Sequence, residues 1–203
     1  MIGLLSICAA LRLHGPVETA PGRAVLFVGD SVLAALAGQY PDAGKAICGA
    51  EGWTVTLDAR VCRKSTTPGC LHGSPTSALE VLHTRRNRQS TVVVIMVGHN
   101  DDRGTKFREK VTAILDEVRD APQVFWVSMR EVGKSYVAAN RVIIEEAARY
   151  PHVQVIPWAE ASRQQSSWVT RDGTHLTTTG AKHLAMVICQ SLNAWHMQEY
   201  PSR

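Results

Sequence analysis

Apolar and polar positions along this chain alternate between short apolar runs and longer stretches with helical spacing. Ala24–Val28 and Thr91–Val97 are apolar on both faces, as strands inside a parallel sheet are. The same patterns predict further strands at 53–58, 124–127 and 153–156, and helices at 32–39, 77–88, 106–119, 135–150 and 178–196. This alternation predicts an α/β fold, a three-layer α/β/α sandwich around a five-stranded parallel sheet.

One domain accounts for this pattern. No linker, repeat or low-complexity stretch divides residues 23–203, which we expect to fold together. Residues 1–22 precede that domain and contain Ile2–Leu13, an apolar stretch of signal-peptide length without a basic residue before it or an Ala-x-Ala cleavage site. The sequence leaves three origins open for this head: an export signal, the remnant of a membrane segment, and a packed N-terminal helix.

Composition narrows the class of protein. The 203 residues are 45% hydrophobic and 20% charged, which fits one globular domain and excludes a disordered or collagen-like chain. The net charge of +4 comes from scattered lysines and arginines. The nearest approach to a cluster, Arg85, Arg86 and Arg88, falls at the end of a predicted helix, where cations suit the helix dipole. We therefore expect no nucleic-acid partner.

Polar, reactive residues follow two of the predicted strands and stand in the last loop. Asp30–Ser31 comes after the first strand, Asn100–Asp101 after the central strand, and Asp172–His175 just before the last helix. The carboxyl ends of parallel strands share one edge of a sheet, and ligands bind there. We expect these three segments to meet at that edge.

Two of these segments suggest a nucleophile and its base. Ser31, between a strand and a helix, is placed where backbone N–H groups can meet a negative oxygen. Asp172, three residues before His175, can orient the imidazole so that its Nε2 accepts a proton from a serine hydroxyl. Each segment alone has a plainer interpretation: Ser31 as a helix N-cap, and 172–175 as a polar loop with an exposed histidine. Their combination favours catalysis.

Three motifs also stand in the order and spacing of a known family. Gly29-Asp30-Ser31, Gly98-His99-Asn100-Asp101 and Asp172-Gly173-Thr174-His175-Leu176 resemble the first, third and fifth sequence blocks of the SGNH hydrolases, also called GDSL-type esterases. The resemblance implies a flavodoxin-like fold with Ser31 as nucleophile, His175 as general base and acid, and Asp172 as the orienting carboxylate. It also implies an oxyanion hole made by the Ser31 N–H, the N–H of a second-block glycine and the side-chain amide of Asn100.

The second block departs from the family. Residues 58–63, Asp-Ala-Arg-Val-Cys-Arg, are similar to the Asp-x-x-Val-Gly-Arg segment of SGNH enzymes related to peptidoglycan O-acetyltransferases, with Cys62 at the glycine position. The resemblance makes the Cys62 N–H the third oxyanion donor, on the condition that φ is negative there. The alternatives are an alignment that is off by one residue and a Cys62 that is a buried structural thiol.

Five cysteines are too few for a disulfide scaffold, and none forms a Cys-x-x-Cys pair. Cys62 and Cys70 flank a loop that could turn the chain back into a disulfide, which would fix the loop without a glycine. Two reduced thiols, or a zinc site with His72, are the alternatives for this pair. The motifs need no metal and no cofactor, so we expect neither.

These observations predict a serine esterase that hydrolyses small acyl esters of acetyl type, either as small molecules or on an envelope carbohydrate, through an acyl-serine. Two other functions stay open: an O-acyltransferase domain with the same triad, beside a membrane acyl donor, and a non-catalytic carbohydrate-binding domain of the same fold. The location is expected to be extracytoplasmic or secreted, with the cytoplasm as the alternative. The sequence does not determine the oligomeric state.

Four polar or aromatic residues outside the motifs are weaker candidates for the site. Arg130 and Asn140 could reach the cleft, but their expected position is the solvated surface. His183 is expected to be a structural residue of the last helix without a companion. Trp168 either walls the acyl pocket or is an aromatic residue of the core or rim.

Overall fold

The structure is a computed structural model that describes residues 23–37, 48–70, 76–85 and 91–201. The interpretations of the head at 1–22 and of His72, Arg86 and Arg88 lie outside the described residues. Within these ranges, no helix has the length and apolar character that crossing a bilayer requires.

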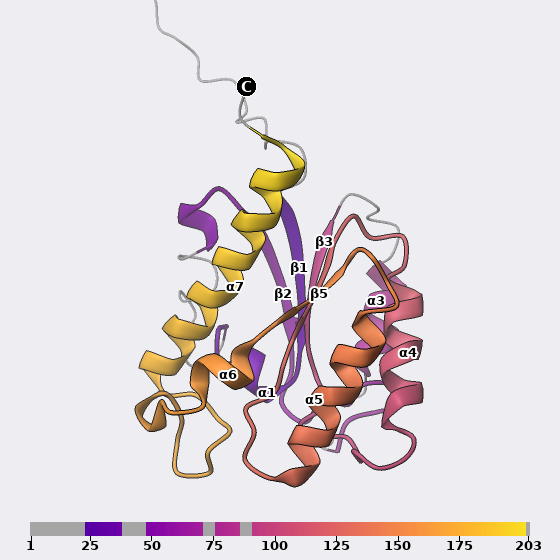
Figure 1. Cartoon of the computed structure of the whole chain (residues 1–203), viewed down its shortest axis with the longest axis vertical. Coiled ribbons are helices and arrows are strands. Elements are labelled where there is room, and N and C mark those ends of the chain that lie inside the picture. The colour runs from indigo at the N-terminus through magenta and orange to yellow at the C-terminus, as the bar shows by residue number, and fades with distance from the viewer. Residues whose placement is uncertain (1–22, 38–47, 71–75, 86–90, 202–203) are drawn as a thin grey trace, which may run out of the picture.

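In the described part of the chain, five parallel strands form the central sheet (Figure 1). They are β1 (Ala24–Gly29), β2 (Thr54–Ala59), β3 (Val92–Met96), β4 (Val124–Val127) and β5 (Val153–Ile156), in the order β2-β1-β3-β4-β5. The strand order reverses between β1 and β3, so their carboxyl ends lie side by side at a point where ligands bind in such sheets. The predicted α/β class is confirmed.

Helices cover both faces of the sheet and give the predicted three layers (Figure 1). One side carries α1 (Ser31–Ala34), α6 (Trp158–Ser162), the 3-10 helix η1 (Ser166–Trp168) and α7 (Thr178–Glu199), and the other carries α3 (Ala78–Arg85), α4 (Phe107–Glu117) and α5 (Lys134–Ala147). The alternation of β1 side chains fits this division: Val25 and Phe27 pack toward α7, and Leu26 and Val28 toward α4.

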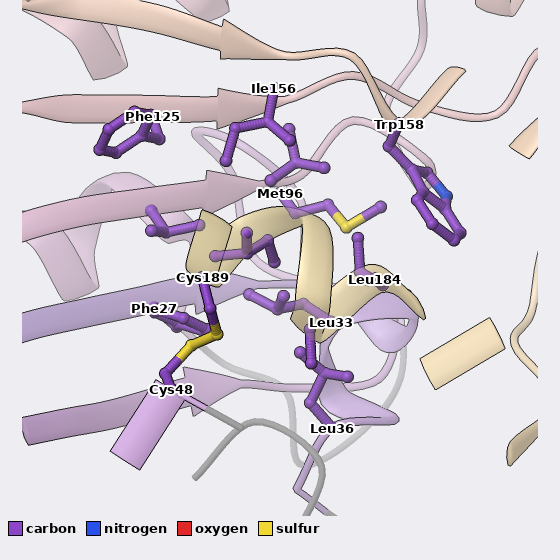
Figure 2. Packing of buried hydrophobic residues seen from close by; sticks show 14 of the residues in the cluster. Phe27, Leu33, Leu36, Cys48, Met96, Phe125, Ile156, Trp158, Leu184 and Cys189 are labelled. Atoms are coloured by element: carbon purple, nitrogen blue, oxygen red, sulfur yellow. A yellow bond between two sulfur atoms is a disulfide. The ribbon is translucent and has the colours of Figure 1, made fainter. Parts of the chain in front are cut away.

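Figure 2 shows the core between the sheet and α7. Phe27 of β1, Leu33 of α1 and Leu184 of α7 are fully buried in it. Burial of each such side chain contributes roughly 1.5–3 kcal/mol. Because β1 leads directly into α1, the packing that stabilises the fold also fixes the position of Ser31.

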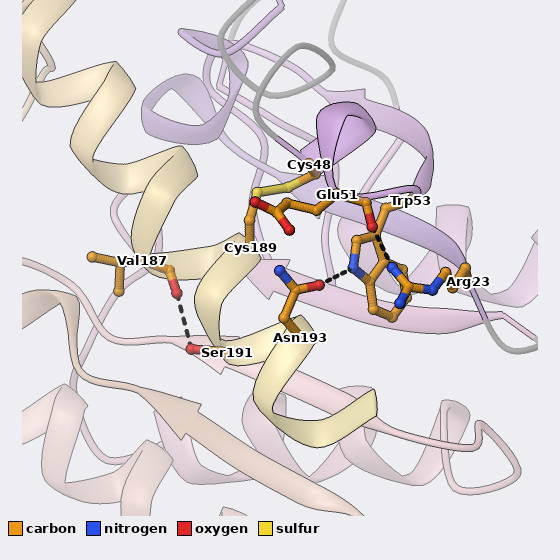
Figure 3. Close-up of a disulfide and its surroundings, with 8 residues drawn as sticks. All are labelled: Arg23, Cys48, Glu51, Trp53, Val187, Cys189, Ser191 and Asn193. Carbon is orange, nitrogen blue, oxygen red and sulfur yellow. Dashed lines mark hydrogen bonds between the residues drawn. A yellow bond between two sulfur atoms is a disulfide. The ribbon is translucent and has the colours of Figure 1, made fainter. Parts of the chain in front are cut away.

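A disulfide that the sequence did not predict crosses this core. It joins Cys48 and Cys189, which are buried and 141 positions apart (Figure 3). Nearby, the indole N–H of Trp53 donates a hydrogen bond to Asn193 Oδ1 of α7 at 2.7 Å. The segment before β2 is therefore attached to α7 by one covalent and one polar contact.

Two differences from the predicted elements have local causes. The helix predicted at 32–39 ends at Ala34, because Leu36 and Ala37 donate to carbonyls three residues back, as in a tighter turn. The short helices α6 and η1 were missed, since five and three residues are too few to show a helical period.

Candidate active site

Ser31 is the first residue of α1 and follows directly on the end of β1. The residue before it, Asp30, is fully buried and accepts a hydrogen bond from the Val32 N–H at 3.1 Å. Asp30 is therefore the N-cap of this helix, and the N-cap interpretation of Ser31 was wrong. The Ser31 hydroxyl is left for another partner.

That partner is His175. Ser31 Oγ lies 3.0 Å from His175 Nε2, and His175 Nδ1 lies 2.7 Å from Asp172 Oδ2. The fold brings Ser31 and His175 together across 144 positions of sequence, from the end of β1 and from the loop before α7. The three side chains form one hydrogen-bonded chain that ends at a serine hydroxyl.

Hydrogen bonds hold Asp172 in its ionised state. Burial acts to raise the pKa of Asp172, but donors from the His175 ring, the Thr174 and His175 N–H groups and the Thr170 hydroxyl outweigh it and hold the pKa well below the ordinary 3.8. An ionised carboxylate only accepts hydrogen bonds, so the proton belongs on His175 Nδ1. Nε2 is then an acceptor for the serine hydroxyl, which is the arrangement a general base needs.

The turn between Asp172 and His175 depends on a glycine and on an arginine. Gly173 has a φ of +73°, a backbone conformation that residues other than glycine rarely adopt. The Gly173 carbonyl accepts a hydrogen bond from Arg130 Nη1 at 3.0 Å, and the other guanidinium nitrogens bind two carbonyls at the end of α6. The expected solvated position of Arg130 was wrong: its half-buried side chain clamps the turn.

Asn100 reaches the same edge of the sheet from the end of β3. Gly98, with a φ of +125°, turns the chain there, and a Cβ at this position would come within 3.0 Å of Met129 Sδ. Asn100 Nδ2 donates a hydrogen bond to the Arg63 carbonyl at 3.1 Å, which places Asn100 beside the loop that carries Cys62. No described residue accepts the second amide hydrogen of Asn100, which could therefore bind a ligand.

Cys62 and Cys70 are joined by a disulfide, which confirms the bridge among the alternatives for this pair and excludes a free thiol. Among the described residues, no group of three or more His, Cys, Asp or Glu side chains could hold a metal ion. The condition of a negative φ at Cys62 was wrong, because φ is +63°: the backbone keeps the left-handed conformation that glycine adopts freely. No described residue accepts a hydrogen bond from the Cys62 N–H.

Arg63 supports this loop from inside the protein, a role that the sequence did not indicate. Its fully buried side chain forms an ion pair with Asp58 at 2.8 Å and donates to the Gly29 and Asp58 carbonyls. Burial raises the pKa of Asp58, but Arg63 and Arg85 beside it lower that pKa by more. These contacts join the ends of β1 and β2 to the Cys62 loop.

Asp30 and Asp101 accept hydrogen bonds from loop N–H groups. Asp30 accepts a hydrogen bond from the His99 N–H, and its Oδ2 lies 2.8 Å from His99 Nδ1. The side chains of both residues are almost completely buried. Asp101 accepts from the Ser65 N–H at 2.9 Å and pairs with Lys110 at 3.0 Å. Asp30 and Asp101 therefore bind other groups, and the carboxylate that contacts His175 is that of Asp172.

The expected surface position of Asn140 and the expected lack of a companion for His183 were wrong. Asn140 is buried, and its amide pairs with both the N–H and the carbonyl of Met129, at 2.9 and 2.7 Å. His183 has a companion, since its ring stacks on Trp168 with 3.9 Å between centroids. Trp168 also stacks on Trp158, which makes it a packed aromatic between α6 and α7.

Known proteins resemble this chain in part of its sequence and in its fold. No family model matches it. A 107-residue segment, 53% of the chain, is 27% identical to the peptidoglycan O-acetyltransferase OatA of Listeria monocytogenes, and that segment spans 16% of the length of OatA.

Solved structures extend the likeness to most of the chain. The lipase/acylhydrolase from Enterococcus faecalis is 16% identical with a TM-score of 0.65, over 85% of this chain and 96% of that one. The C-terminal catalytic domain of Streptococcus pneumoniae OatA, solved with a methylsulfonyl adduct, is 16% identical with a TM-score of 0.64, over 86% and 95%. The chain has the SGNH hydrolase fold that its motifs implied.

Proposed function

We propose that this protein is an SGNH-type serine esterase that removes small acyl groups, of acetyl type, from the hydroxyl groups of a carbohydrate. One observation carries the proposal: the unbroken chain from Ser31 Oγ through His175 to Asp172, with distances of 3.0 and 2.7 Å. The fold shared with an acylhydrolase and an O-acetyltransferase domain supports the same class of reaction.

The reaction divides into two steps. His175 Nε2 takes the Ser31 proton as Oγ attacks the ester carbonyl, and it returns this proton to the departing alcohol, which leaves an acyl group on Ser31. Water then attacks the acyl-serine, and His175 moves one proton from the water to Ser31 Oγ as the carboxylic acid leaves. Asp172 keeps Nδ1 protonated and stabilises the imidazolium in both steps.

Three donors are proposed to stabilise the negative oxygen of the tetrahedral intermediate: the Ser31 N–H, the Cys62 N–H and the Asn100 side-chain amide. Neither N–H has an acceptor among the described residues, and Asn100 uses one of its two amide hydrogens on Arg63. Loss of one such donor typically lowers kcat by about 10²–10³.

When the Cys62–Cys70 bridge is removed, glycine at position 62 should preserve kcat better than alanine does. The variants Cys62→Gly/Cys70→Ala and Cys62→Ala/Cys70→Ala both lack the disulfide, but only glycine reaches a φ of +63° without strain. Alanine costs about 1–2 kcal/mol in this conformation, so only about a tenth of the molecules of the alanine variant should hold the Cys62-loop N–H in place. The kcat of the alanine variant for p-nitrophenyl acetate should therefore be about tenfold below that of the glycine variant. Equal kcat values in initial-rate assays would contradict a donor role for the Cys62 N–H.

Acyl transfer is the second candidate, and the similarity to OatA favours it. The same residues would serve, since a sugar hydroxyl can take the place of water in the second step. A membrane acyl donor working beside this chain belongs to this candidate.

Labelling and acyl partition test both candidates. We expect a fluorophosphonate to modify the peptide that contains Ser31 and to stop hydrolysis of p-nitrophenyl acetate in proportion to labelling. With a chito-oligosaccharide present, mass spectrometry compares acetate released with acetyl groups transferred: an excess of acetate supports the esterase, and an excess of acetylated sugar supports the transferase. No label on Ser31, with neither product formed, would leave the non-catalytic carbohydrate-binding domain.

We also propose that residues 23–203 form the catalytic domain and work outside the cytoplasm. Two disulfides among the described residues, Cys48–Cys189 and Cys62–Cys70, are typical of proteins in oxidising compartments. Residues 1–22 would then serve export or anchoring. Alkylation of the unreduced protein taken from cells should leave these four cysteines unmodified, and their modification would contradict the proposed location.

A further inference from the structure

A cavity of about 410 Å³ lies next to the turn that carries Asp172 and His175. Its walls come from the loop after β4, the start of α5, and α6. The volume falls within the range of small-molecule sites, roughly 300–1,000 Å³. The chemistry proposed for Ser31 does not use this cavity.

Arg130 connects the cavity to the catalytic turn. It lines the cavity and donates a hydrogen bond to the Gly173 carbonyl at 3.0 Å. Val132, also in the lining, lies so close to the turn that a Cβ at Gly173 would come within 3.0 Å of it. A molecule in the cavity would therefore lie beside the segment that holds His175 against Ser31, at the same carboxyl edge of the sheet.

The lining is positively charged. Arg130, Lys134 and Arg163 contribute three cations, and Glu131 contributes the one carboxylate. Within the described ranges, the guanidinium of Arg130 binds only carbonyl oxygens, which do not neutralise its charge. Lys134 has no ion pair among the described residues, and Glu131 stands 4.0 Å from Arg163, at the limit of an ion pair. An anion that enters the cavity gains more attraction than repulsion.

We propose that this cavity is a subsite for an anionic group, a carboxylate or a phosphate, on the carbohydrate whose ester is cleaved at Ser31. The inference rests on the proposed esterase function and specifies its substrate class as an acidic sugar. Lys134 and Arg163 bind the anion from the rim, where Arg163 is 64% exposed. Val137 and Ala159 supply an apolar wall against which a sugar ring can pack.

Four acetate esters test the subsite: monoacetylated methyl glucuronide, monoacetylated methyl glucose 6-phosphate, monoacetylated methyl glucoside and p-nitrophenyl acetate. The wild-type KM should be about 10–100-fold lower for at least one acidic sugar than for the neutral sugar. Lys134→Gln/Arg163→Gln should abolish this preference by raising KM with kcat unchanged, and should leave p-nitrophenyl acetate hydrolysis unchanged. Added salt should reduce the preference in the wild type.

The matched control is Arg119→Gln. Arg119 is 61% exposed and follows α4, whose end lies at the opposite edge of the sheet, so this variant should keep the wild-type preference. Equal KM values for all three sugars, or an equal loss of preference in the control, would overturn the subsite while leaving the esterase intact. Failure to hydrolyse p-nitrophenyl acetate would instead overturn the esterase function. The acidic sugar with the lower KM identifies the group as carboxylate or phosphate.

Discussion

Replacement of Ser31 by alanine should lower kcat for hydrolysis of p-nitrophenyl acetate by a factor of about 10⁴–10⁶. Without the Ser31 hydroxyl, there is no serine proton for His175 Nε2 to accept and no oxygen on which an acyl-enzyme can form. The residual rate would come from the oxyanion donors acting on direct attack by water. Because Asp30 rather than Ser31 caps α1, the variant should fold as the wild type does, which near-UV circular dichroism checks.

The control for this variant is Ser191→Ala. Ser191 Oγ donates to the Val187 carbonyl within α7 (Figure 3). Because Ser191 lies in the second half of α7, several turns beyond the start of the helix, its loss should leave kcat unchanged. His175→Ala should cost as much as Ser31→Ala, and the double variant no more than either, because the two residues act as one unit. Losses that multiply in the double variant would show that Ser31 and His175 act independently.

The candidate site could be predicted from the sequence where a local pattern reports it. Ser31 and Asn100 follow apolar runs that read as buried strands, and parallel strands bring such ends to one edge. The roles of Arg63 and Arg130 could not be predicted, because both donate hydrogen bonds to backbone carbonyls, Arg63 in addition to its ion pair with Asp58, and every residue type has a carbonyl. Asn140 was missed for the same reason, since both of its main partners belong to the Met129 backbone.

The fold follows the same division. The central strands, buried on both faces, could be recognised from their uninterrupted apolar runs. The helices α6 and η1 could not, because five and three residues are too few to show a repeating helical pattern. The Cys62–Cys70 bridge spans eight positions and was among the alternatives for that pair. Nothing in the sequence indicates that Cys48 and Cys189, 141 positions apart, come within 5.2 Å at their Cα atoms. Only the packing of α7 against the sheet brings them together.

Removal of the Cys48–Cys189 bridge should lower the free energy of unfolding by about 5 kcal/mol. A crosslink restricts the unfolded chain, and the restriction grows with the logarithm of the loop that it closes. The loop here spans 141 positions, against eight for Cys62–Cys70, for which the same relation gives about 2.5 kcal/mol. Cys48→Ala/Cys189→Ala should therefore destabilise the protein about twice as much as Cys62→Ala/Cys70→Ala.

Urea unfolding followed by tryptophan fluorescence measures both losses under the same oxidising conditions. A smaller loss for the Cys48–Cys189 pair than for Cys62–Cys70 would contradict the loop-entropy argument. It would indicate that contacts such as the Trp53–Asn193 hydrogen bond already hold the two segments together in the unfolded chain. Because Cys48 precedes the amino end of β2, opposite the edge that carries Ser31, the folded variant should keep the wild-type kcat. Cys62→Ala/Cys70→Ala should lose both stability and kcat, which distinguishes the Cys48–Cys189 bridge from the Cys62–Cys70 bridge beside the candidate active site.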